Sequence, residues 1–217
     1  ILSEKACGKP KGESYHIRTN ITAAYNISNL TAAIAGLHCQ SFDMEKLIEA
    51  CVDVKQVDGR MEHVQNELGI DLIIDYAHTP DGFDKIFEFA RSVKNPDGRL
   101  YAVFGSAGKR DKEKRHVLGR IASVNCDYII LTEEDPRDET ACDIANQIAL
   151  EIPKESYEFI DNRYEAISKA IAMAKAGDMV LVLGKGDERY LERSKGKESW
   201  MGDEKAAAEI AAKIARV

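Results

Sequence analysis

The sequence predicts an α/β fold in which helices cover both faces of a mostly parallel sheet. Four of five short apolar runs are nearly continuous in apolar residues, which is typical of strands buried on both faces. Segments with helical spacing separate the runs, so strand and helix alternate from about residue 70 onward. The five runs lie at residues 72–74, 100–104, 128–131, 157–160 and 179–183.

The helical segments are recognised by apolar residues three and four positions apart. One such segment covers residues 83–93, and Pro80 suits its first turn because proline is tolerated there. A second covers residues 164–174. The last covers residues 204–216, and Asp203 is its expected N-cap.

The N-terminal quarter of the chain follows a different pattern. Residues 16–26 are predicted to be extended, and residues 29–37 and 44–52 to be helical. One strand and two helices are too few for an independent hydrophobic core. We therefore expect residues 1–58 to be the tail of a preceding domain and residues 59–217 to be the α/β domain.

Composition and charge exclude several classes of protein. Of the 217 residues, 44% are hydrophobic and 31% are charged, which is ordinary for a soluble globular protein. No apolar run approaches the roughly 20 residues that span a bilayer, and the start lacks a signal peptide. The chain begins with Ile1 rather than Met, so we expect it to be part of a longer protein. The net charge of −7 argues against binding the phosphate backbone of a nucleic acid.

The cysteines and histidines predict neither a metal centre nor a disulfide framework. The five cysteines form no CxxC pair, and the five histidines form no HxH or HxxxH cluster. A reduced, cytoplasmic setting is the simplest interpretation. The residues concerned are Cys7, Cys39, Cys51, Cys126, Cys142, His16, His38, His63, His78 and His116.

Polar and glycine-containing loops follow four of the apolar runs. Parallel α/β sheets bind ligands at the carboxyl ends of their strands, so these loops are the candidate functional segments. They cover residues 75–80, 105–111, 132–137 and 184–188.

The loop after the second run resembles a phosphate loop without matching its pattern. The pattern GxxxxGK[ST] needs four residues between the glycines and a Ser or Thr after the lysine. Here two residues separate Gly105 from Gly108, and Arg110 follows Lys109. The glycines permit close approach of a ligand to the backbone, and the alternative is a turn before a solvated basic helix.

Two further candidates follow the first run. Asp75 ends a buried strand, where its carboxylate suits a ribose hydroxyl or a cation–phosphate group, or else caps the following turn. His78 lies in the same loop, and a single loop histidine is more often structural or solvated than functional.

The loop after the third run combines an arginine with carboxylates. Arg137 can bind a ligand carboxylate with both arms of its guanidinium, and the neighbouring acids, among them Glu134 and Asp135, can accept an ammonium group. Glu188, after two exposed-backbone glycines, offers another ammonium acceptor. Together these groups suit a zwitterionic amino acid. The alternatives are a solvated charged face for residues 133–139 and a flexible hairpin near Glu188.

Taken in order, the loops resemble the C-terminal part of the Mur ligases, and most closely the branch that forms the tripeptide. Each matching string is weak alone, but together they are specific. The strings are Tyr25-Asn26-Ile27-Ser28-Asn29-Leu30, Gly59-Arg60-Met61-Glu62, Asp75-Tyr76-Ala77-His78-Thr79-Pro80-Asp81, Phe104-Gly105 through Gly108 to Arg110-Asp111-Lys112 with Lys114-Arg115, Asp135-Pro136-Arg137, and Gly184-Lys185-Gly186 with Glu188.

The resemblance implies a cytoplasmic, ATP- and Mg²⁺-dependent amide ligase of peptidoglycan synthesis. Such enzymes phosphorylate the terminal carboxylate of a UDP-linked muramoyl dipeptide, and the amine of a diamino acid then attacks it. The Rossmann-like C-terminal domain presents the amino acid and closes over ATP. By this resemblance the ATP-binding residues are Asn26, Arg60, Asp75 and His78, and the amino-acid-binding residues are Arg115, Glu134, Asp135, Pro136, Arg137, Gly184 and Glu188.

Two departures from the family pattern affect the expected substrate and activity. Members that add meso-diaminopimelate usually carry Asn where this chain has Asp135. Arg137 favours an amino acid with a distal carboxylate, whereas Asp135 favours a distal ammonium such as that of lysine; diaminopimelate is the preferred expectation. The family's phosphate loop, Mg²⁺ ligands and modified lysine do not occur in these residues, so we expect residues 1–58 to be only the end of the central ATP-binding domain and the chain alone not to catalyse ligation.

Three other interpretations of the sequence remain open. A related ligase of peptide recycling or folylpolyglutamate synthesis would share much of the pattern. A stand-alone amino-acid or nucleotide binding module would fit the missing phosphate loop. A plain α/β interaction domain predicts no ligand preference, so substitution of Arg137 or Glu188 would change only surface charge.

Overall fold

The structure, a computed structural model, describes residues 2–3 and 14–216 and divides into two compact units, residues 1–57 and 58–217. Cys7 and the terminal residue Ile1 lie outside the described residues. None of the described helices is long and apolar enough to cross a membrane.

The first unit contains two helices and a pair of short strands. Strands β1 (Leu2–Ser3) and β2 (Ser14–Tyr15) are antiparallel. Helix α1 (Ala24–Cys39) packs with α2 (Met44–Ala50) around a small core. The prediction that residues 16–26 are extended is wrong from Ala24 onward, because β-favouring residues end at Thr22 and a helix-favouring, alanine-containing segment begins.

The second unit is built on a six-stranded sheet with the order β3-β4-β8-β5-β6-β7. All neighbouring strands are parallel except β3 and β4. The five predicted strands are therefore present, and the mostly parallel sheet is confirmed. The strands are β3 (Glu62–His63), β4 (Asp71–Asp75), β5 (Leu100–Phe104), β6 (Tyr128–Leu131), β7 (Tyr157–Phe159) and β8 (Met179–Leu183).

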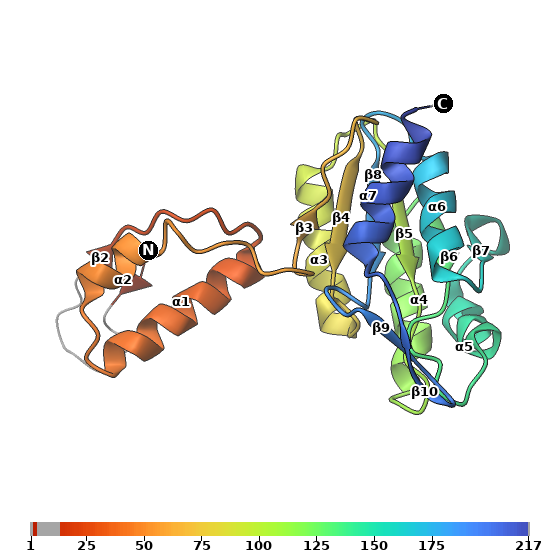
Figure 1. The fold of residues 1–217 in the computed structure, drawn as a ribbon, viewed down its shortest axis with the longest axis horizontal. Helices are drawn as coiled ribbons and strands as arrows, with labels where there is room; N and C mark the ends of the chain where they lie inside the picture. Colours follow the sequence, from red (N-terminus) through yellow and green to blue (C-terminus); the bar gives the residue numbers. More distant parts are fainter. Residues whose placement is uncertain (1, 4–13, 217) are drawn as a thin grey trace. The chain divides into compact units, whose positions relative to one another are not determined.

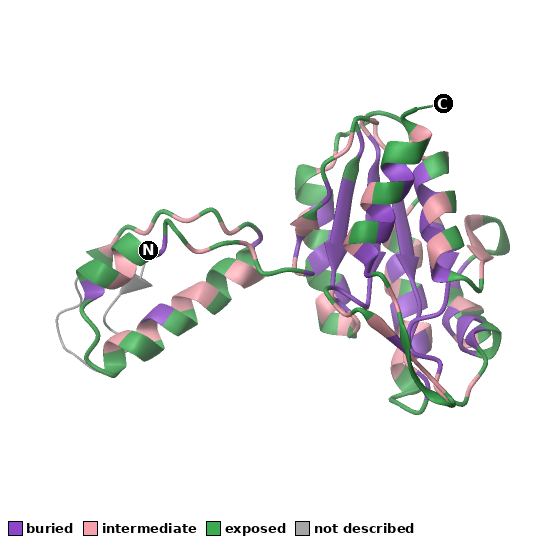
Figure 2. Cartoon of the chain, viewed as in Figure 1, coloured by how far each residue is buried: buried purple, intermediate pink, exposed green. Residues whose placement is uncertain are grey.

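Helices cover both faces of this sheet (Figure 1). On one face α3 packs against α4 and α4 against α5, and on the other α6 packs against α7. The central strands are buried along their whole length (Figure 2), as their continuous apolar sequences require. The helices are α3 (Pro80–Val93), α4 (Glu113–Asn125), α5 (Ala141–Ile148), α6 (Arg163–Met173) and α7 (Asp203–Ile214), with short 3₁₀ turns at Ala149–Glu151 and Lys154–Ser156.

Helix α3 begins as the sequence predicts, whereas α7 does not. Pro80 is the first residue of α3, and the hydroxyl of Thr79 accepts the N–H of Gly82 at 3.2 Å. The residue before α7 is Gly202 at a φ of 94°, so Asp203 is the first helical residue and not the N-cap. Its carboxylate instead binds Arg163, with Nε to Oδ1 at 2.8 Å and Nη2 to Oδ2 at 2.6 Å. Both side chains are fully buried.

A two-stranded hairpin, β9 (Tyr190–Arg193) and β10 (Gly196–Ser199), lies between β8 and α7 and was not predicted. Backbone contacts tie it to the loop after β6, since the N–H of Arg137 donates to the carbonyl of Glu192 at 2.9 Å. The hairpin thereby brings further polar side chains to the carboxyl edge of the sheet.

Candidate functional site

A cavity of about 470 Å³ lies at the carboxyl edge of the sheet. The loops after β4, β5, β6 and β8 line it, together with β9. Its lining residues are Tyr76, His78, Thr79, Ala107, Arg110, Asp111, Lys114, Glu134, Asp135, Arg137, Gly184, Glu188, Tyr190 and Glu192. The predicted ligand edge therefore holds a polar cavity.

The glycines of the loop after β5 allow two loops to pack backbone against backbone. A Cβ on Gly105 or Gly108 would overlap the carbonyl oxygen of Thr132 or Pro136. The N–H of Gly108 donates to the carbonyl of Asp135 at 2.8 Å. These glycines thus serve the packing of the loop after β6, and the exposed Lys109, Arg110 and Lys112 that follow Gly108 agree with the alternative of a turn before a solvated basic helix start.

Glu134 is the one predicted acid whose carboxylate makes no hydrogen bond or ion pair within the described residues. Its exposure is only 6%. Burial raises the pKa of this carboxyl, while the charges of Arg163, Lys114 and His78 oppose the rise. Gly184, at a φ of 103°, leaves room for it, because a Cβ there would lie 2.9 Å from Glu134 Cδ and overlap the nearer oxygen.

Arg137 lines the same cavity with its guanidinium already engaged. Nη1 donates to the carbonyl of Gly108 at 2.8 Å, and Nη2 donates to Glu192 Oε2 at 3.0 Å. The Glu192 side chain is 36% exposed, so this ion pair faces solvent and is weak enough to exchange. The backbone of Arg137 is held at a φ of 52°, a conformation unusual for a non-glycine residue.

Asp135 and Glu188 share a buried lysine. Lys185 Nζ donates to Asp135 Oδ1 at 2.9 Å and to Glu188 Oε2 at 2.5 Å. The hydroxyl of Tyr190 donates to Glu188 Oε1 at 3.0 Å. These two predicted ammonium acceptors therefore already hold an ammonium group that belongs to the protein.

The residues expected near ATP take different positions. The carboxylate of Asp75 is buried and accepts the N–H groups of Met61 at 2.8 Å and Ala77 at 2.7 Å. It does not line the cavity and joins the segment at Gly59–Met61 to the sheet. Arg60 lies over the ring of Tyr76, 4.3 Å from its centroid.

His78 and Lys114 form one wall of the cavity. His78 Nδ1 lies 2.9 Å from the carbonyl of Tyr76, which can only accept, so the proton is on this nitrogen. Lys114 Nζ donates to the carbonyl of His78 at 2.7 Å, and burial lowers the pKa of its ammonium. This wall places the ammonium of Lys114 in the same cavity as the Glu134 carboxylate, and the two charges interact.

Arg115 does not line the cavity. It is fully buried and donates to both oxygens of Glu139, at 2.9 and 3.1 Å, and to Gln147 and the carbonyl of Ala107. Its Nε has no hydrogen-bond partner within the described residues, and direct contact between Arg115 and an amino acid stays a prediction. The hydrogen bond from Arg115 holds the pKa of Glu139 well below its usual range.

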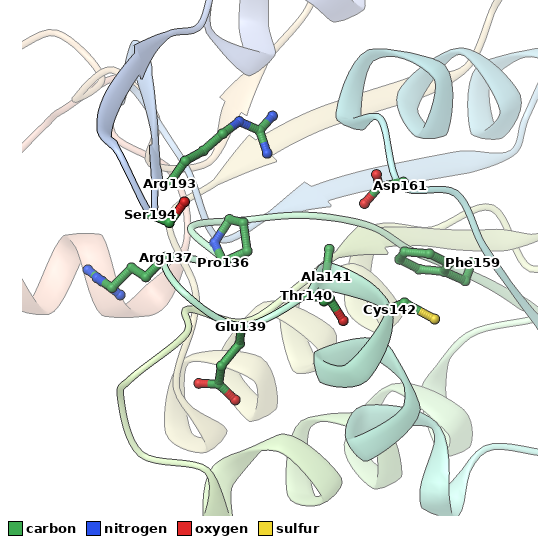
Figure 3. Close-up of a pocket in the computed structure, with 10 residues that line it drawn as sticks. All are labelled: Pro136, Arg137, Glu139, Thr140, Ala141, Cys142, Phe159, Asp161, Arg193 and Ser194. Carbon is green, nitrogen blue, oxygen red and sulfur yellow. The ribbon is translucent and has the colours of Figure 1, made fainter.

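Pro136 lines a second cavity of about 390 Å³ instead of the first, on the side of α5 (Figure 3). In Figure 3 the guanidinium of Arg137 points away from Phe159 and Cys142, which line the far wall of this second cavity. Asn26 lies in α1 of the first unit, where its buried Nδ2 has no hydrogen-bond partner within the described residues.

The sequence reading missed several residues of the cavity. The ion pair of Lys185 is not among the predictions, although a lysine three positions before Glu188 and just after a fully apolar strand is a signal for a buried ion pair. Tyr190 and Glu192 were missed because the β9–β10 hairpin was not predicted. The signal available in the sequence was Gly196, because glycine favours hairpin turns; in the structure it takes a φ of 112° there.

Comparison with known proteins identifies the family of the chain. The family model described as "Mur ligase, glutamate ligase domain" matches residues 59–186, more than half of the chain. The chain is 40% identical over 184 residues to a UDP-N-acetylmuramyl-tripeptide synthetase of Borreliella afzelii, covering 82% of this chain and 36% of that protein. It is 38% identical over 182 residues to UDP-N-acetylmuramoyl-L-alanyl-D-glutamate–2,6-diaminopimelate ligase 2 of Clostridium acetobutylicum, covering 83% and 37%.

Solved structures of the same fold include a ligase of this family. The chain is similar to a UDP-N-acetylmuramoyl-L-alanyl-D-glutamate–2,6-diaminopimelate ligase with a TM-score of 0.67 and 27% identity, covering 94% of this chain and 41% of that one. A pseudomurein peptide ligase type C from Methanothermus fervidus shares the fold, with a TM-score of 0.63 and 21% identity over 91% and 37% of the two chains. This chain spans about two fifths of the length of these relatives. The resemblance in the sequence motifs is confirmed, and the chain belongs to the Mur ligase family.

Proposed function

We propose that this chain is the amino-acid-presenting part of an ATP-dependent ligase that adds a diamino acid to UDP-N-acetylmuramoyl-L-Ala-D-Glu in the cytoplasm. The observation that carries the proposal is the cavity in which an unpaired carboxylate, Glu134, lies near an exchangeable guanidinium, Arg137. Names of the relatives that match most of the chain support the same activity.

Glu134 receives an ammonium group of the amino acid in this proposal. The charged form of a buried carboxylate is costly alone, so a cation that pairs with it offsets its desolvation. Gly184 lies beside the Glu134 carboxylate and lines the same cavity.

Arg137 receives the distal carboxylate of the amino acid by exchange with Glu192. The Arg137–Glu192 pair is solvent-facing and is lost at little cost, whereas two parallel hydrogen bonds from a guanidinium to a carboxylate are strong. This favours meso-diaminopimelate over lysine, which lacks a distal carboxylate.

The ATP side of the site is assigned to other residues of the chain. On the cavity wall, Lys114 beside His78 supplies a cation, which fits a phosphate. The ring of Tyr76, with Arg60 stacked on it, fits a base. Asp75 holds these segments in place through backbone N–H groups. Bound ATP supplies the phosphoryl group that activates the dipeptide carboxylate. The Mg²⁺ ligands are proposed to lie mostly outside this chain, with residues 1–58, including Asn26, as the tail of the central ATP-binding domain.

The test is substrate-dependent release of ADP by the complete gene product that carries this chain. We expect release to require both the UDP-linked muramoyl dipeptide and a diamino acid, with meso-diaminopimelate used more efficiently than lysine. Release that is indifferent to the amino acid would overturn the proposal. Amino-acid binding without any ADP release would favour the alternative of a non-catalytic binding module, and turnover of glutamate on a folate would favour a folylpolyglutamate ligase.

A further inference from the structure

Lys185 is a fully buried cation beside the cavity. Its side chain has 0% exposure, and its ammonium lies within hydrogen-bond distance of two carboxylates, those of Asp135 and Glu188. It also lies 4.6 Å from the ring centroid of Tyr190. A lysine in such a place is an unusual feature that the proposed binding roles do not explain.

The ammonium joins three segments that the sheet alone does not hold together. Asp135 comes from the loop after β6, Glu188 from the loop after β8, and Tyr190 from β9. Strand β5 lies between β8 and β6, so these loops are not neighbours in the sheet. Asp135 Oδ1 also accepts the N–H of Glu192 at 2.8 Å, which anchors the hairpin to the same centre.

The charges of this centre depend on one another. Two carboxylates bound to one ammonium carry a net charge of −1, and without the ammonium they would repel each other in a site of low dielectric. Burial alone would lower the pKa of Lys185, but the hydrogen bonds to Glu188 and Asp135 outweigh burial and raise it. The lysine is therefore charged, and its loss would leave two unpaired acids.

We propose that Lys185 is a positioning residue that supplies the countercharge of Asp135 and Glu188 and holds them at the wall of the amino-acid cavity. The inference rests on the proposed function and refines its specificity. Lys185 already holds one oxygen of each of these two acids, which makes Glu134 the more available acceptor for the incoming ammonium. Lys185 compensates part of the negative charge of Asp135, so an acid at this position does not by itself select lysine.

Substituting Lys185 by methionine removes the countercharge and keeps an unbranched apolar stem. One of the two carboxyls then takes up a proton at a raised pKa, because like charges at short range cannot both ionise easily. At high pH both are charged and separate; at lower pH they share a proton and stay together. The other charged or titratable groups of the cavity wall are Glu134, Tyr76, His78, Arg110, Asp111, Lys114, Tyr190 and the Arg137–Glu192 pair.

The experiment compares the KM for meso-diaminopimelate in the complete gene product and in the variants Lys185→Met, Asp135→Asn and Lys185→Met/Asp135→Asn. Lys169→Met is the matched control, since the Lys169 side chain is about half exposed, lies 3.6 Å from Glu158 and does not line the cavity. Each KM is measured from about pH 6 to about pH 8.5, together with kcat and the melting temperature.

We expect Lys185→Met to raise the KM by about tenfold at the highest pH, and the excess over wild type to fall as the pH is lowered. The double variant removes the repulsion, so its KM should lie within about threefold of that of Asp135→Asn at every pH. Lys169→Met should match wild type. If Lys185→Met does not fold, the comparison of KM between the double variant and Asp135→Asn still tests the inference.

A Lys185→Met variant whose excess KM does not change with pH would overturn the inference. So would a double variant with a KM about tenfold above that of Asp135→Asn. Failure of the proposed function is a separate result, because wild-type protein would then release no ADP on addition of the diamino acid.

Discussion

Gly184 and Gly196 provide a matched pair of positions for testing how Glu134 is placed. Both glycines have positive φ, 103° and 112°, so an alanine at either is strained by the same backbone conformation. They differ in their surroundings. A Cβ on Gly184 would lie 2.9 Å from Glu134 Cδ, whereas a Cβ on Gly196 would meet nothing within 4 Å.

The shared backbone strain is of the order of 1–3 kcal/mol, and Gly184→Ala and Gly196→Ala should both lower the melting temperature by a few degrees. Only Gly184→Ala also forces the carboxylate of Glu134 to move, since ordinary contact begins at 3.4 Å. Loss of a charge-assisted hydrogen bond costs about 1.5–3 kcal/mol, which corresponds to a KM raised by roughly tenfold to a hundredfold.

The assay is the amino-acid dependence of ADP release by the complete gene product. Gly184→Ala should raise the KM for meso-diaminopimelate at least about tenfold, and Gly196→Ala should change it less than about twofold. The KM for ATP should change little in either variant. If Gly184→Ala raises the KM for the amino acid no more than Gly196→Ala does, the role given to Glu134 is refuted.

Three further predictions concern stability. Burial raises the pKa of Glu134 above its unfolded value, so the protonated carboxyl favours the folded state at low pH and this contribution is lost as the pH rises through the raised pKa. The melting temperature of Glu134→Gln should therefore be higher than that of wild type at pH 8, and this difference should disappear at pH 4. Arg115 lowers the pKa of Glu139, so the pair stabilises the fold at pH values above the ordinary pKa of glutamate, and this stabilisation is lost as the pH falls. Glu139→Gln should lower the free energy of unfolding by about 2 kcal/mol at pH 7, measured with denaturant. It should also reduce the dependence of that free energy on pH in the acid range. Arg163→Met leaves Asp203 buried and unpaired and should cost about 3–5 kcal/mol, of which adding Asp203→Leu should recover more than half.

The strands and the ligand edge could be predicted from the sequence because the signals are local. A continuous apolar run such as residues 179–183 can be satisfied only by burial on both faces, and the parallel arrangement then brings the following loops to one edge. Thr79 and Pro80 similarly mark the start of α3 with groups that act within one turn.

The pairing of the charged residues could not be predicted, because it depends on contacts between distant segments. Asp203 was expected to cap α7, but a buried arginine forty positions earlier, Arg163, takes its carboxylate. Arg115 was expected to hold the amino acid, and its pairing with Glu139, 24 positions away in the chain, was not foreseen. The sequence places these charges near the site without showing which of them are already paired.

The hairpin of β9 and β10 was missed for a related reason. Its strands are polar, and β10 is exposed at every residue, so no apolar alternation marks them. Only the register of Tyr190 and Glu192 against the loop after β6 makes them part of the cavity.

The most direct test of the account is the effect of Glu134→Gln on the two Michaelis constants of the complete gene product. The amide keeps the size of the side chain and removes its charge. The account predicts that the KM for meso-diaminopimelate rises at least about tenfold while the KM for ATP stays within about twofold. An unchanged KM for the amino acid, or a rise confined to ATP, would contradict the claim that this cavity presents the amino acid.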